Sequence, residues 1–112
     1  MTQYIAEIYS DLKGRKHLLV DDVALHYFPD RPQTIVPLAI SLALITGSAE
    51  ETALFAANLG GDADSVASIG GAIAGALRPA TVNETWFQVV SAINGYNLLD
   101  VATSLATLRP AF

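Results

Sequence analysis

Apolar side chains recur roughly every three to four positions along most of the chain, a spacing typical of amphipathic α-helices. The first such segment, residues 2–13, carries its apolar stripe at Tyr4, Ile5, Ile8, Tyr9 and Leu12. Gly14 follows it and is expected to end the helix in a left-handed conformation. Residues 18–28 are ambiguous between a short helix and an extended segment, whereas residues 29–32 begin and end with proline and predict a turn.

Proline and serine mark the expected helix starts in the middle of the chain. Pro37 is expected in the first turn of a helix that ends near Thr46, because a first turn tolerates the missing proline N–H. Ser48 and Glu51 have the spacing of a capping box, in which the serine hydroxyl accepts the backbone N–H of Glu51. This pair predicts a helix over residues 49–58.

The remainder of the chain predicts three more helices. Residues 62–65 can cap a helix that ends near Leu77. Two further helices follow asparagine caps, namely residues 84–94 after Asn83 and residues 98–108 after Asn97. Since no alternating strand pattern, internal repeat or linker interrupts this series, we predict an all-α fold. Residues 1–112 are expected to form a single compact helical bundle.

The helix expected after residues 62–65 has two apolar faces of different size. Large side chains form one face, and small ones form the other: Val66, Ile69, Ile73 and Leu77 against Ala67, Gly71, Ala74 and Gly75. Because a helical glycine costs about 1 kcal/mol relative to alanine, the glycines here predict close approach to a neighbouring backbone. We therefore expect this helix to be buried on two sides, at the centre of the bundle.

Charge and cysteine content exclude several classes of protein. The 112 residues include 6 basic and 11 acidic ones, for a net charge of −5, so we expect neither nucleic acid nor an anionic membrane as a partner. The absence of cysteine excludes disulfides and thiolate zinc sites. No signal peptide opens the chain, and its longest apolar run, residues 35–45, is far below the roughly 20 residues of a membrane span. We expect a cytoplasmic protein.

The composition is unusually apolar for so short a chain. Hydrophobic residues make up 52% and charged residues 15%, whereas about 25% charged residues is usual. A small domain has much surface for its volume and needs polar side chains to cover it. We therefore expect part of the apolar surface to be covered by another copy, another chain or the rest of a larger domain.

The most specific chemical signal lies at Asp62, Asp64 and Ser65, directly after a pair of glycines. Two carboxylates and a hydroxyl are the hard oxygen ligands that magnesium favours. The preceding glycines permit a tight turn and leave room for a ligand. The same residues also suit a plain helix cap, where a carboxylate meets the positive end of the helix dipole. The residues alone leave both interpretations open.

Residues 56–77 resemble the Gly-Gly-Asp-x-Asp-Thr signature of the ADP-ribosylglycohydrolase family, followed by its helix rich in glycine and alanine. The resemblance covers about residues 34–108. It implies an all-helical fold, two magnesium ions, and removal of ADP-ribose from a modified protein or a related small molecule. By this resemblance Asp62 and Asp64 are metal ligands, and Ser65 stands where threonine is usual and keeps the hydroxyl.

One part of the family pattern is missing. The family carries a second metal-binding motif nearer its amino terminus, a threonine, two aspartates and a second threonine in a row, which this sequence lacks. Asp21 and Asp22 are paired but have no flanking hydroxyl residues, and we interpret them as the start of a helix or a solvated turn. The chain thus resembles about the last third of the family's fold. We expect it to supply only part of a site that a second chain or copy completes.

The sequence therefore favours metal-dependent hydrolysis of an ADP-ribosyl N- or O-glycosidic bond, while the activity of the isolated chain stays open. The alternative is a non-catalytic helical interaction module, or an inactive remnant, whose acidic loop is a helix cap. An Asp-x-Asp pattern also occurs in haloacid-dehalogenase-type phosphatases, but there it follows a strand of a parallel sheet. Tyr96 is a candidate for stacking on a nucleotide, with side-chain packing as the simpler interpretation. The pattern identifies no catalytic or substrate-binding residue.

Overall fold

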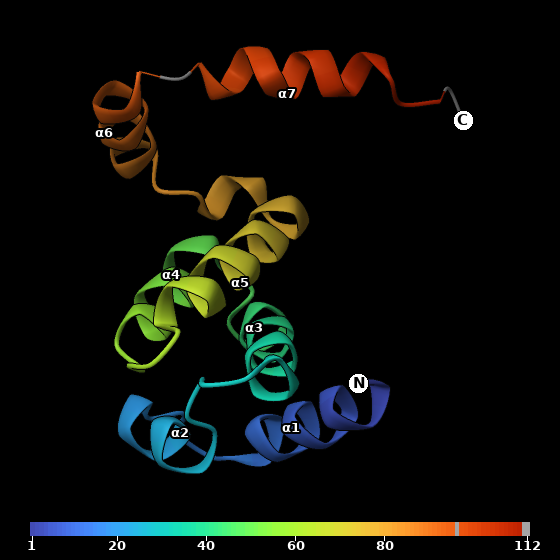
Figure 1. Ribbon diagram of the computed structural model, residues 1–112, viewed down its shortest axis with the longest axis vertical. Coiled ribbons are helices and arrows are strands. Elements are labelled where there is room, and N and C mark those ends of the chain that lie inside the picture. Colours follow the sequence, from blue (N-terminus) through green and yellow to red (C-terminus); the bar gives the residue numbers. More distant parts are fainter. Residues whose placement is uncertain (96, 111–112) are drawn as a thin grey trace. The chain divides into compact units, whose positions relative to one another are not determined.

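The computed structural model describes residues 1–95 and 97–110, which are helical and contain no strand (Figure 1). The α-helices are α1 (Thr2–Gly14), α2 (Val20–His26), α3 (Pro32–Thr46), α4 (Ala49–Ala57), α5 (Ala63–Leu77), α6 (Glu84–Asn94) and α7 (Leu98–Thr107). A short 3-10 helix, η1 (Pro79–Thr81), follows α5. The all-α prediction is confirmed for the described part of the chain, and the ambiguous segment around residues 18–28 is helical.

The contacts group the chain into two compact units, Met1–Val82 and the residues from Asn83 onward. The first unit contains α1 to α5 and η1, and the second contains α6 and α7. That residues 1–112 form one bundle stays a prediction.

Helix α3 is the centre of the first unit. It packs against α1, α4 and α5, and α4 packs along α5 (Figure 1). Its sequence is apolar on nearly every side, which is typical of a helix surrounded by neighbours. The buried core draws on all five α-helices of this unit and on the residue Leu59: Ile8, Leu12, Val23, Ile35, Leu38, Ala39, Leu42, Ala56, Leu59 and Val66.

Two predicted helix boundaries are wrong. Helix α1 ends at Gly14, and the residue after it, Arg15, has a φ of −76°, so no left-handed glycine stops the helix. Helix α3 begins at Pro32, not near Pro37. Arg31 is extended, as the residue before a proline prefers, which places Pro32 in the first turn where its missing N–H costs nothing. Pro37 is instead buried inside the helix.

The side-chain caps predicted at Ser48, Asn83 and Asn97 are confirmed, whereas Asp62 makes no side-chain cap at the start of α5. The Ser48 hydroxyl accepts the N–H of Glu51 at 3.2 Å, at the start of α4. Asn83 accepts the N–H of Trp86 at 3.0 Å, and Asn97 accepts the N–H of Asp100 at 3.2 Å. Each cap satisfies one of the N–H groups that the first turn of a helix leaves without a partner.

The orientation of α5 differs from the prediction. Its buried residues are Val66, Gly70 and Ala74, whereas Leu77 is 60% exposed and Ile69 is also exposed. A Cβ atom on Gly70 would lie 2.8 Å from the Thr52 side chain and 3.1 Å from the Ala39 carbonyl oxygen. Helix α5 therefore packs against α3 and α4 with the face that contains Gly70, because that face allows close approach. Much of the face with large side chains stays exposed.

The second unit has no buried residue in either α6 or α7. The exposed apolar side chains of these helices are Trp86, Val89, Val90, Ile93, Leu98, Leu99, Val101, Leu105 and Leu108. These exposed side chains account for part of the unusually high apolar content of the sequence. Over the described residues, no helix has both the length and the apolarity needed to cross a membrane.

Candidate metal site

The acidic motif, residues 60–65, covers the end of the turn that follows α4 and the first residues of α5. Leu59 is buried and anchors the end of α4 in the core. Gly60 and Gly61 follow with φ values of +83° and +55°, a left-handed backbone that side chains other than glycine rarely adopt. Asp62 is the residue before the first turn of α5, and its carbonyl accepts the N–H groups of Ser65 and Val66. The turn thus delivers both carboxylates to the start of α5.

A segment from the α2–α3 connection holds this turn in place. The N–H of Asp62 donates to the carbonyl of Pro29 at 2.7 Å. A Cβ atom on Gly61 would lie 2.5 Å from that carbonyl oxygen and 2.9 Å from the ring of Phe28. The close approach of Phe28 and Pro29 therefore requires glycine in this turn. These two residues fill the space that the sequence analysis expected a ligand to occupy.

The Asp62 and Asp64 side chains are exposed, and Ser65 is partly buried. Although Asp62 occupies the cap position of α5, its side chain makes no capping hydrogen bond. Within residues 1–95 and 97–110, neither carboxylate has a hydrogen bond or an ion pair. Two carboxylates without protein partners, beside a hydroxyl, fit the oxygen ligands of a magnesium ion.

The described residues contain no group of at least 3 histidine, cysteine, aspartate or glutamate side chains able to hold a metal ion. Asp21 and Asp22 lie in the first turn of α2, which is the helix start expected for them. The acidic motif therefore places two exposed carboxylates at the start of α5, and the described residues group no third potential ligand with them. The metal-binding role of Asp62, Asp64 and Ser65 stays a prediction, and the stacking role of Tyr96 lies outside the described residues.

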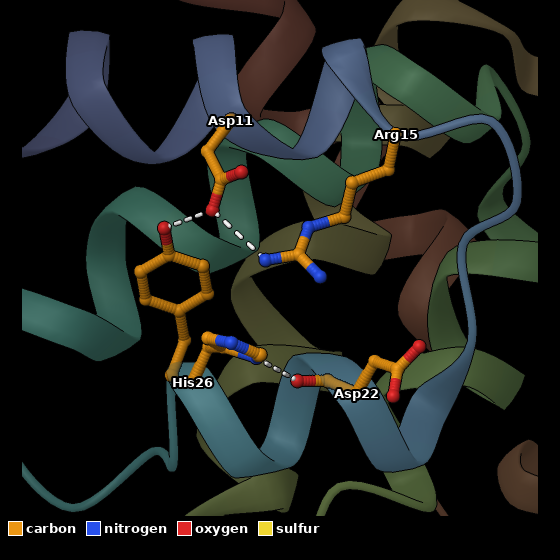
Figure 2. Close-up of polar contacts among 5 residues, drawn as sticks. Asp11, Arg15, Asp22 and His26 are labelled. Carbon is orange, nitrogen blue, oxygen red and sulfur yellow. Dashed lines mark hydrogen bonds and ion pairs between the residues drawn. The ribbon is translucent and has the colours of Figure 1, made fainter.

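Sequence reasoning missed a polar cluster between α1 and the end of α2. The Tyr27 hydroxyl donates to the Asp11 carboxylate, which also pairs with Arg15 at 3.1 Å (Figure 2). The hydrogen bond from Tyr27, followed by that from Arg15, lowers the pKa of Asp11. Burial, followed by the bond to Asp11, raises the pKa of Tyr27 to about 12. No periodicity could reveal this cluster, because its carboxylate and its phenol belong to separate segments.

His26 lies beside this cluster at the end of α2. Its Nδ1 atom is 2.8 Å from the backbone carbonyl oxygen of Asp22, one turn earlier in the same helix (Figure 2). This local contact agrees with the absence of any metal-ligand spacing between the two histidines of the sequence. Nothing in it connects His26 to the acidic motif.

The described residues form helices only, with a glycine pair before two exposed carboxylates at the start of α5. The sequence profile described as ADP-ribosylglycohydrolase matches residues 6–111, and the chain belongs to this family of hydrolases. The match includes most of α1 and all of α2, so it extends further toward the amino terminus than the resemblance over residues 34–108. No curated protein and no solved structure matches the chain. The phosphatase alternative fails, because helix α4 and not a strand precedes Asp62.

Proposed function

We propose that this chain takes part in metal-dependent hydrolysis of an ADP-ribosyl N- or O-glycosidic bond. The substrate is an ADP-ribosylated protein or an ADP-ribose-like small molecule. The observation that carries the proposal is the pair of carboxylates at Asp62 and Asp64, exposed and without protein partners in a family member. A cap would engage the Asp62 side chain in hydrogen bonding, whereas a metal ligand needs that side chain free.

In this proposal Asp62 and Asp64 hold magnesium, and the Ser65 hydroxyl acts as a neutral ligand. Bound magnesium supplies Lewis acidity and lowers the pKa of a coordinated water. The chain's own contribution is to fix two negative charges at one end of α5. The complete site holds two ions.

The remaining ligands come from a second chain or a second copy that completes the domain. This part of the proposal is supported by the absence, among the described residues, of a group of at least 3 potential ligands. It also gives a reason for the apolar side chains that α6 and α7 leave exposed. We propose the cytoplasm as the compartment of this reaction.

Magnesium titration by calorimetry tests the metal site directly. We expect saturable binding to the full chain at millimolar magnesium or below, and its loss in the Asp62→Ala/Asp64→Ala variant. The matched control is Asp21→Ala/Asp22→Ala, which removes two charges from an exposed aspartate pair at another helix start. Equal loss in the control would show that net charge, not a site, attracts the ion. Absence of binding to the wild-type chain would reject the metal role for this chain.

The second candidate function is a non-catalytic helical interaction module. The exposed apolar faces of α6 and α7 favour it, since large exposed apolar patches mark interaction surfaces. Magnesium binding distinguishes the two candidate functions, because a non-catalytic interaction module is not expected to bind the ion. The same titration, followed by sedimentation with and without magnesium, therefore decides between them.

A further inference from the structure

We propose that Phe28 and Pro29 are positioning residues for the acidic motif. They hold the backbone of residues 60–62 in the one conformation that presents both carboxylates at the start of α5. The consequence for magnesium affinity rests on the proposed function, whereas the effect on the backbone does not.

The strongest contact runs through the main chain. Pro29 is fully buried, and its carbonyl accepts the N–H of Asp62 at 2.7 Å. That N–H belongs to the first predicted ligand, so the contact fixes the peptide plane from which this side chain emerges. The bond spans two segments that are distant in sequence, and local helix formation cannot replace it.

The Phe28 ring supplies the second contact. Its edge lies where a Cβ atom of Gly61 would be 2.9 Å away and one of Gly60 would be 3.3 Å away. A pair of glycines is the most flexible dipeptide that a turn can contain, because both residues reach positive φ without steric cost. The Phe28 ring limits the backbone conformations that these glycines can adopt, because many of them would bring the backbone into the ring.

The segment that holds the motif is itself fixed at both ends. On one side the Tyr27 hydroxyl bonds to Asp11, which ties the segment to α1 (Figure 2). On the other side Pro32 begins α3, and the N–H of Asp30 donates to the carbonyl of Phe28 at 3.0 Å to close the turn. The acidic motif therefore contacts a segment that is held at both ends.

Rigidity of this kind changes affinity. A metal ion that binds two carboxylates on a flexible backbone must order that backbone, and the entropy lost weakens binding. A preformed turn is already ordered before the ion binds, so this loss of entropy is smaller. Phe28 is 49% exposed, so truncating it removes little of the buried core, and the fold should survive the test.

Amide hydrogen exchange measured by NMR on the full chain tests the support itself. In Phe28→Ala we expect the Asp62 N–H to exchange at least about tenfold faster than in the wild type, because opening of the turn is easier. Phe28→Tyr keeps the ring and should restore slow exchange. The matched control is Tyr4→Ala, which removes an aromatic ring that is 46% exposed on α1. Unchanged exchange at Asp62 in Phe28→Ala would overturn the proposal.

Magnesium titration of the same variants tests the consequence for binding. We expect Phe28→Ala to weaken magnesium affinity severalfold, with Phe28→Tyr and Tyr4→Ala close to wild type. If the wild-type chain binds magnesium and Phe28→Ala binds it equally well, the positioning role in metal binding is wrong. If the wild-type chain binds no magnesium, the proposed function fails, and the exchange measurement alone decides whether Phe28 and Pro29 position the turn.

Discussion

At Gly70 the lack of a side chain decides how α5 packs. A Cβ atom there would meet both the Thr52 side chain at 2.8 Å and the Ala39 backbone at 3.1 Å. Thr52 is buried and its hydroxyl already shares a hydrogen bond with Thr46 at 2.6 Å, so it has little freedom to move aside. At the adjacent Gly71 a Cβ atom would meet nothing within 4 Å. Of these two neighbouring glycines, only Gly70 is therefore required by the packing of α5.

We predict that Gly70→Ala destabilises the chain by roughly 1–3 kcal/mol, as expected for an added carbon in a tightly packed contact. Gly71→Ala should instead stabilise it, by at most about 1 kcal/mol, because alanine is the better helix former. Urea unfolding followed by circular dichroism measures both changes. An unchanged or raised stability in Gly70→Ala would show that the close contact at Gly70 does not control the packing of α5.

How far the sequence predicts single residues depends on how local their interactions are. The caps at Ser48, Asn83 and Asn97 were predictable, since each bond spans only three residues. The predictions for Gly14 and Pro37 were wrong because they used the usual positions of these residue types, a helix stop for glycine and a first turn for proline. The actual ends of α1 and α3 depend on the neighbouring residues and on tertiary packing. Which glycine of α5 packs closely could not be predicted, because the answer lies in α3 and α4.

Between elements, the contact of Tyr27 with Asp11 makes the attachment of α1 sensitive to pH. The pKa of Tyr27 is raised from 10.0 to about 12 in the folded chain. Between these values the unfolded chain loses the phenolic proton first, so the stabilising contribution is present below pH 10 and disappears as pH rises toward 12. For Asp11 the lowered pKa has the opposite effect, since its contribution is lost as pH falls below the ordinary value of 3.8.

We predict that the free energy of unfolding of the wild-type chain falls more steeply between pH 10 and pH 12 than that of Tyr27→Phe. The variant should be less stable at neutral pH, by about 1 kcal/mol for one lost hydrogen bond, and the difference should shrink at high pH. Denaturant unfolding at a series of pH values measures this. The informative quantity is the difference between the two proteins. Parallel curves would contradict the assignment.

The same distinction between local and distant contacts applies to the acidic motif. Asp62, Asp64 and Ser65 stand in one short run, so their likeness to metal ligands was visible in the sequence. The support from Phe28 and Pro29 was not, because those residues read only as a turn and meet the motif through tertiary packing. The pair of glycines was visible in the sequence as a tight turn, but it did not show which residues lie against that turn.

At the scale of the whole molecule, the buried core and the acidic motif belong to the same unit. Every residue of the core cluster lies in Met1–Val82, as do Asp62, Asp64 and the segment that supports them. Helices α6 and α7 contain no buried residue. A pair of short helices without a core lacks the main source of folding free energy. Stability and the candidate site should therefore both reside in the first unit.

We predict that a fragment of residues 1–82 folds cooperatively and keeps the magnesium affinity of the full chain, whereas a peptide of residues 83–112 has much less helix than its share of the structure. Circular dichroism, urea unfolding and calorimetry on the three proteins measure these properties. The shorter fragment should also be more soluble, since it lacks the apolar faces of α6 and α7. If the fragment is unfolded while the full chain is stable, α6 and α7 must supply burial that the first unit needs. In that case the two units form one cooperative domain, as the unbroken series of helices in the sequence predicts.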